Sequence, residues 1–204
     1  MVKITDLNQI TEILGKDKFF SRERVITALN ELGANIPFEK EICFSSTLDI
    51  SQPLPENWIV SFITSTPLTK IVQLCQNYEK LSWIHPDSIK AFPWDNQPSN
   101  NGYYIAANLE GLAGDHFIGN DEAVSKKLGA GHRAATPHEL LELAFLLKLF
   151  TNKTALNSFV HCYKIDDAIF EIHGIRHDKK IKIEPMRGKF SFYPDRGVIP
   201  VKII

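Results

Sequence analysis

The residues best suited to chemistry lie in one glycine-containing segment that precedes a predicted helix. Gly129 and Gly131 are followed by His132 and Arg133. Glycine backbone, an arginine and a helix N-terminus together can hold a phosphate or a carboxylate. The segment lacks the Gly-Lys-Ser/Thr ending of a P-loop, and it does not match a dinucleotide-binding fingerprint. The candidate anion-binding residues are Gly131, His132, Arg133 and Thr136.

Histidines in and near this segment allow an enzyme as one interpretation. His132 and His138, with His116 from an Asp-His pair in an upstream loop, are residues that can act as general acids or bases. The enzyme would be a small hydrolase or transferase acting on an anionic substrate. This interpretation requires the side chains to converge on one pocket, and it fails if His116 and His138 lie on opposite faces. We assign no catalytic residue from sequence alone and keep this enzyme as the alternative function.

Other histidines and cysteines do not form a convincing metal or nucleophile site. His173 and His177 have a spacing that brings two zinc ligands together on a helix. Their surroundings predict a strand and a turn, and four residues along a strand span about 13 Å, too far for one ion. Cys162, Glu171 and His173 are neighbours on the polar face of a predicted sheet, which offers no oxyanion hole and no exclusion of water. We therefore expect no metal and no cofactor.

Three aromatic residues flank the segment 93–102, which is rich in proline and asparagine, and a fourth lies near its start. Aromatic residues at this density either hold two parts of a chain together or form an exposed surface for a partner. We keep the second interpretation as the candidate interaction site. Its residues are Trp83, Trp94, Tyr103 and Tyr104.

Composition is that of an ordinary globular protein. Of 204 residues, 44% are hydrophobic and 23% are charged, which suits one large domain or two small lobes. The three cysteines are odd in number and widely spaced, so we expect a reducing compartment rather than disulfides. The chain shows neither a signal-peptide pattern nor an apolar stretch of the roughly 20 residues that span a bilayer, which predicts a cytoplasmic location without membrane contact and leaves secretion without a signal peptide open as an alternative.

Charge is balanced overall but uneven along the chain. The formal net charge is −1, and proteins that bind nucleic acid usually carry a basic excess, so we do not expect a nucleic-acid partner. From Arg176 onward, eight basic residues stand against three acidic ones, a net charge of +5 that leaves −6 on residues 1–175. The two parts can pair within one molecule or between two, so a homo-oligomer stays open.

Start and stop signals predict the helices that position these sites. Thr136 is followed by Pro137 and, three residues later, by Glu139, which is the pattern of a capping box. The helix that follows, to Phe150, is the most apolar segment and is expected at the centre of the core. Further helices are predicted over 6–14 and after the capping residues Ser21, Thr66 and Asn120, and strands over 41–50 and 58–64.

Alternating residues near the C-terminus predict an antiparallel meander with a defined register. Two-residue turns at 166–167 and near 177–178 would put apolar residues on one face and polar residues on the other, as a half-buried sheet requires. Phe190 and Phe192 extend the alternation toward a fourth strand. The expected opposite pairs are His161 with Ile172, Tyr163 with Phe170, Ile165 with Ala168, Ile172 with Ile183 and Gly174 with Ile181.

One part of the chain resembles a bacterial and phage-type domain of uncharacterised activity. The resemblance runs from Gly102-Tyr103-Tyr104-Ile105 to the capped helix Thr136-Pro137-His138-Glu139-Leu140-Leu141, about a quarter of the chain. That family has a short strand, a glycine-bearing loop, a short helix and then a capped apolar helix. Its Gly- and Trp-rich C-terminal strands are absent here. The resemblance implies a bacterial protein and no functional residue.

These patterns together predict an α+β protein whose helices pack on an antiparallel C-terminal β-meander, with a smaller N-terminal helical and β lobe. The expected parts are residues 1–92 and 103–204, which can also fuse into one domain. No set of residues supplies the nucleophile, base and stabiliser that an enzyme needs. The leading functional hypothesis is therefore a non-catalytic binding or accessory module that acts through protein–protein contacts.

Overall fold

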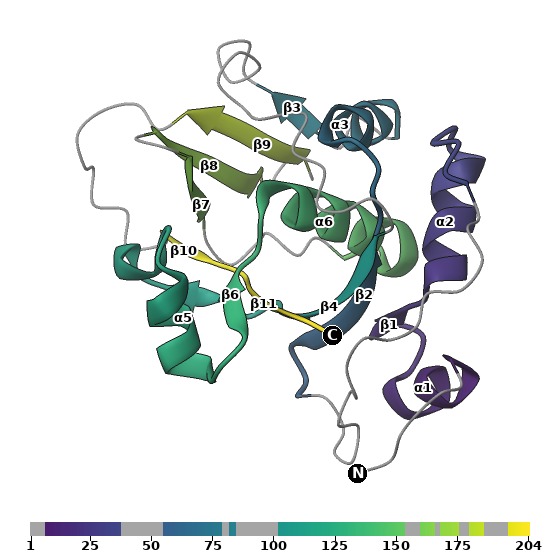
Figure 1. Cartoon of the computed structure of the whole chain (residues 1–204). Coiled ribbons are helices and arrows are strands. Elements are labelled where there is room, and N and C mark those ends of the chain that lie inside the picture. Colours follow the sequence, from purple (N-terminus) through teal and green to yellow (C-terminus); the bar gives the residue numbers. More distant parts are fainter. Residues whose placement is uncertain are drawn as a thin grey trace.

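The chain folds into helices and two mixed β-sheets, an α+β architecture as predicted (Figure 1). The predicted strand 41–50, Trp94 and the pair Phe190 and Phe192 lie outside the described residues. The computed structural model describes residues 7–37, 55–78, 82–84, 102–153, 160–165, 168–175, 180–185 and 196–204.

The first sheet is five-stranded and runs in the order β1-β2-β4-β11-β6. β1 is parallel to β2, and the remaining neighbours are antiparallel. The residues of β2 and β4 after their first positions are all buried, so both faces of this sheet are covered along these two strands. The strands are β1 (Phe19–Phe20), β2 (Trp58–Ile63), β4 (Tyr103–Asn108), β6 (His132–Ala134) and β11 (Pro200–Ile203).

The second sheet is six-stranded, in the order β3-β9-β8-β7-β10-β5. It contains the predicted meander, and its register is confirmed at every predicted pair, including His161 opposite Ile172 and Gly174 opposite Ile181. The alternation of apolar and polar residues was thus sufficient to align three strands. The strands are β3 (Ser82–Ile84), β5 (Leu112–Ala113), β7 (Val160–Ile165), β8 (Ala168–Ile175), β9 (Lys180–Pro185) and β10 (Arg196–Val198).

Both sheets take strands from either side of the predicted boundary at 93–102. β2 pairs with β4 in the first sheet, and β3 pairs with β9 in the second. Short strands that the sequence did not predict, β10 and β11, bring the C-terminal residues into both sheets. A separation of residues 1–92 from 103–204 as folding units stays a prediction.

The helices begin at the predicted signals, with one exception. Ser21 and Asn120 accept hydrogen bonds from the backbone N–H groups of Arg24 and Ala123. Thr66 was expected to cap α3, but the helix begins one residue later with Pro67 at the N-cap and no side-chain cap. The hydroxyl of Thr66 instead accepts a hydrogen bond from the hydroxyl of Thr64. The helices are α1 (Leu7–Leu14), α2 (Arg22–Glu31), α3 (Leu68–Asn77), η1 (Asp115–Phe117), α5 (Asp121–Leu128) and α6 (Pro137–Thr151).

Helix α6 is the centre of the core, as its apolar sequence predicted. Every residue from His138 to Lys148 is buried, so the helix is covered on all sides. It lies between the two sheets, and α3 packs against it through an edge-on contact between Tyr78 and Phe145 (Figure 1). The side chains of this helix therefore contact several elements at once, and its charged residues must find partners inside the protein. None of the helices in the described part of the chain is long and apolar enough to cross a bilayer.

Candidate functional site

The segment predicted as an anion-binding loop forms a turn and a short edge strand. Gly129 ends α5 and Gly131 follows it, both with positive φ, at 103° and 84°. Such backbone favours glycine, which has no Cβ to clash. The next residues form β6, which pairs with β11 at the edge of the first sheet. The backbone N–H of Ala134 in this edge strand donates to Asp121 Oδ1 at 3.0 Å, so a residue of α5 occupies part of the sheet edge.

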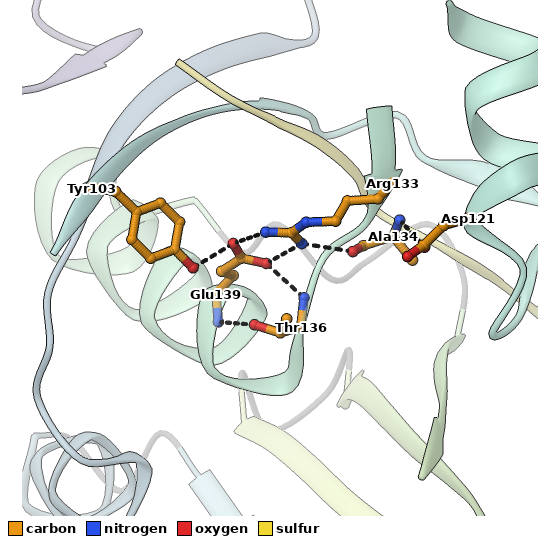
Figure 2. A network of polar contacts seen from close by, with 6 residues as sticks. All are labelled: Tyr103, Asp121, Arg133, Ala134, Thr136 and Glu139. Atoms are coloured by element: carbon orange, nitrogen blue, oxygen red, sulfur yellow. Dashed lines mark hydrogen bonds and ion pairs between the residues drawn. The ribbon is translucent and has the colours of Figure 1, made fainter. Parts of the chain in front are cut away.

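Arg133 is the centre of a closed network with Glu139, not a free cation (Figure 2). Its Nη1 and Nη2 donate to the two oxygens of Glu139 at 2.7 and 2.6 Å. Such a two-point contact matches the planar guanidinium to the planar carboxylate and is stronger than a single contact. Tyr103 Oη donates to Glu139 Oε1 at 2.6 Å, and Thr136 N donates to Glu139 Oε2 at 2.7 Å.

The ionisation of this network is set by burial and by the ion pair together. Burial alone would raise the pKa of Glu139, but the hydrogen bonds and charge of Arg133, with the Tyr103 and Thr136 donors, hold it below its usual value. Hydrogen bonding to Glu139 raises the pKa of Arg133 despite partial burial. Burial and the negative charge of Glu139 raise the pKa of Tyr103. All three groups therefore keep a single charge state near neutral pH, as a structural pair requires.

Two of the four candidate anion-binding residues are consequently engaged inside the protein. The positive charge of Arg133 is neutralised by Glu139, whose side chain is 0% exposed. Thr136 forms the predicted capping box, with its hydroxyl accepting from Glu139 N and its own N–H donating to the Glu139 carboxylate. The charged and polar groups of the predicted anion site thus bind each other.

His132 lies on the opposite face of the sheet from Arg133, because neighbouring residues of a strand alternate. Its ring contacts Trp58 edge-on, with ring centroids 5.6 Å apart, and its Nδ1 is 2.9 Å from the Gly129 carbonyl oxygen. Lys202 pairs with His132 across the strands and is exposed. We call the surface formed by Trp58, His132 and Lys202 the outer face, because it is the face of the first sheet turned away from α6.

Gly131 borders the outer face. A Cβ atom at this glycine would lie 3.6 Å from Lys202 Cε, which is ordinary contact distance. Of the predicted anion-binding set, Gly131 and His132 therefore remain together on the surface, and the sequence did not identify Trp58 and Lys202 as their neighbours. Those two residues lie about 70 positions away on either side along the chain, and only the pairing of β2, β4, β11 and β6 joins them.

His138 is buried on α6 and does not share a site with the other candidate histidines. Its side chain is 4% exposed and its Nε2 lies 3.0 Å from Glu142 Oε2. His116 is exposed in η1, with its ring against Phe117. Among the described residues, no hydrogen bond or ion pair links His116, His132 and His138. The convergence that the enzyme interpretation required is not formed by these three side chains.

The predicted aromatic interaction site is divided in a similar way. Tyr104 is only 3% exposed, contacts Phe19 and Phe62, and accepts a hydrogen bond from Arg22 N through its hydroxyl. Tyr103 is half-buried, with its hydroxyl on Glu139. Both tyrosines therefore hold elements of the fold together instead of forming an exposed platform. Trp83 lies in β3, Trp94 lies outside the described residues, and an interaction role for these two stays a prediction.

The buried carboxylate Glu142 was missed by sequence reasoning. A signal was present, because a glutamate in the most apolar helix of a chain must be exposed or paired. Glu142 is 0% exposed and accepts a hydrogen bond from Thr64 N at 2.9 Å. Its position one turn after His138 puts both side chains on one face of the helix.

Comparison with protein families, with curated proteins and with solved structures finds no match for this chain. Its function must therefore be argued from its own residues. Within the described ranges, no group of three or more His, Cys, Asp or Glu side chains is placed to hold a metal ion.

Proposed function

We propose that this protein is a non-catalytic binding module that acts through protein–protein contacts. The observation that carries the proposal is the internal pairing of the groups that chemistry would need. Arg133 is bound at two points by the fully buried Glu139. Among the described residues, the three candidate histidines have separate contacts and do not form one group that could supply a nucleophile, a base and a stabiliser.

The outer face is the surface that we assign to the partner. Trp58 is half-buried beside His132, and the exposed Lys202 on β11 pairs with His132 on the edge strand β6. Tryptophan is enriched among the residues that dominate binding energy at protein interfaces, because its large ring buries much area with little loss of freedom. A charge at the rim of such a surface affects the rate and specificity of association.

Charge reversal on the outer face is the test. Proteins that co-purify with the wild-type chain from its native cells should be compared with those retained by Lys202→Glu, and any candidate partner should then be purified and titrated. We expect Lys202→Glu to weaken the binding of the purified partner about 10-fold or more. Lys153→Glu is the matched control, since it makes the same change at an exposed lysine just after α6. Equal binding by both variants, or turnover of an anionic substrate that depends on His132, would contradict the proposal.

A further inference from the structure

The turn between α5 and β6, which borders the outer face, is surrounded by three exposed lysines. Lys126 and Lys127 lie in the last turn of α5, which has Gly129 as its C-cap. Lys202 lies on β11, and its Cε would be 3.6 Å from a Cβ atom at Gly131, so its side chain lies close to the same turn. We call these three lysines the basic rim. Within the described ranges, none of them forms an ion pair with a carboxylate.

The acidic residues of α5 are at the other end of this helix. Asp121 and Glu122 lie in its first turn, and Asp121 Oδ1 already accepts a hydrogen bond from Ala134 N at 3.0 Å. Because a helix rises by about 1.5 Å per residue, the first turn is roughly 6–9 Å along the axis from the two lysines of α5. Positive charge therefore dominates at the end of the helix that leads into the outer face.

His132 gives the outer face a hydrogen-bond acceptor in a defined position. Its Nδ1 is 2.9 Å from the carbonyl oxygen of Gly129. A carbonyl oxygen can only accept, so Nδ1 carries the proton, and in the neutral ring Nε2 has the free lone pair. Among the described residues, none forms a hydrogen bond with this second nitrogen. The backbone N–H of a peptide is a donor that matches such an acceptor.

The outer face suits a peptide better than a nucleic acid. The half-buried ring of Trp58 beside His132 offers an apolar contact for a side chain. Arg133, whose guanidinium could bind a phosphate at two points, is bound to Glu139 instead. The net charge of −1 also lacks the basic excess that binding to phosphates requires.

We propose that the outer face binds an acidic peptide segment of its partner. Carboxylates of this segment pair with the basic rim, one of its backbone N–H groups donates to His132 Nε2, and an apolar side chain between them packs on Trp58. The proposal rests on the protein-binding function proposed above and names the chemistry of the partner. An exposed ion pair changes affinity by less than about 5-fold, so the three lysines act together, mainly on the rate and specificity of association.

Selection of phage-displayed random peptides on the immobilised full-length protein tests the proposal. Peptides that bind wild type but not Trp58→Leu belong to the outer face, provided that far-UV circular dichroism shows the variant to be folded. His132→Gln, at the sheet edge, serves for the same comparison if it is not. We expect these peptides to be enriched in Asp and Glu around an apolar residue.

The other outcomes of the selection separate this proposal from the one on which it rests. Enrichment in basic residues, or in apolar residues alone, would overturn the acidic partner and leave the outer face as a protein-binding surface. If no selected peptide depends on Trp58 or His132, both the acidic partner and the outer face as a docking surface are overturned.

Fluorescence anisotropy with the strongest acidic peptide then measures the part played by the basic rim. Glutamine at all three positions should weaken binding about 10-fold or more, and the loss should shrink at high salt, because salt screens exposed charges. The matched control removes the same charge elsewhere and should bind within about 2-fold of wild type. Equal binding by the two triple variants would overturn the pairing of the basic rim with carboxylates. The test variant combines Lys126→Gln, Lys127→Gln and Lys202→Gln, and the control combines Lys16→Gln, Lys70→Gln and Lys153→Gln.

Discussion

At the scale of single residues, Glu139 shows how a capping signal can also mark a buried ion pair. The sequence pattern Thr136-Pro137-His138-Glu139 predicted only the helix start, which is confirmed. Glu139 also accepts hydrogen bonds from Arg133 and Tyr103, and these contacts bring β6 and β4 onto the first turn of α6. One carboxylate therefore fixes a helix and two strands, and its charge has consequences for stability.

We expect Glu139→Gln to lower the free energy of unfolding by about 3 kcal/mol at pH 7, because it leaves Arg133 without its anion. The folded-state pKa of Glu139 lies below its usual value, so its contribution is present above the unfolded pKa of about 4.3. That contribution is lost as pH falls through the folded pKa, so the difference between wild type and Glu139→Gln should shrink in acid. Urea unfolding at several pH values measures this difference.

Glu12→Gln provides the control for that prediction, since Glu12 is an exposed residue of α1. It should change the free energy of unfolding by less than about 0.5 kcal/mol at any pH. The double variant Arg133→Met with Glu139→Leu should be more stable than Glu139→Gln, because it leaves no charge unpaired. A Glu139→Gln protein as stable as wild type at pH 7 would show that the ion pair contributes nothing to the fold.

At the scale of elements, the sequence predicted the features that depend on residues close together in the chain, namely helix caps and the register of neighbouring strands. Ser21, Asn120 and Thr136 were identified as caps because a capping side chain bonds to backbone two or three residues away. The meander register followed from alternation between strands joined by short turns. The prediction that Thr66 caps α3 was wrong because the Thr66 hydroxyl accepts a hydrogen bond from the Thr64 hydroxyl. Capping rules do not consider a competing side-chain partner of this kind.

Pairing between distant elements could not be predicted from the same signals. The strands β6, β10 and β11 have three, three and four residues, too short to show an alternation. The outer face depends on them, since His132 reaches Trp58 only because β11 and β4 lie between β6 and β2. For the same reason the sequence grouped His132 with Arg133, although strand geometry turns their side chains to opposite faces.

The start of β4 depends on a glycine whose requirement can be measured. Gly102 has φ +66°, and a Cβ there would lie 2.5 Å from Phe62 Cζ and 2.6 Å from the Ile63 carbonyl oxygen. A backbone oxygen in a sheet cannot move aside cheaply, so Gly102→Ala should cost about 3 kcal/mol of stability. Gly33→Ala is the matched control, since Gly33 has φ +89° and open space around it. It should cost only the strain of a left-handed alanine, about 1 kcal/mol. If chemical denaturation shows that Gly102→Ala and Gly33→Ala lose equal stability, the protein has relieved the close contact between the new Cβ atom at position 102 and β2.

At the scale of the whole molecule, the arrangement of the sheets argues for one cooperative unit. β2 has most of its partners in β4, and β3 pairs with β9, so residues before 93 have hydrogen bonds to residues after 102 in both sheets. α3 packs on α6, and the buried residues of α3 include Ile71 and Cys75. A fragment of residues 1–92 would leave these strand edges and apolar surfaces open to water.

We therefore expect residues 1–92 expressed alone to show a poorly dispersed ¹H–¹⁵N spectrum and no cooperative unfolding transition. The full chain should unfold in one transition, with the same midpoint by tryptophan fluorescence and by far-UV circular dichroism, because coincident probes are the mark of a two-state domain. Two separate midpoints, or a well-dispersed spectrum from the fragment, would instead support two folding units divided near 93–102. In that case the strand pairs β2–β4 and β3–β9 would form an interface between domains, and the outer face would belong to both of them.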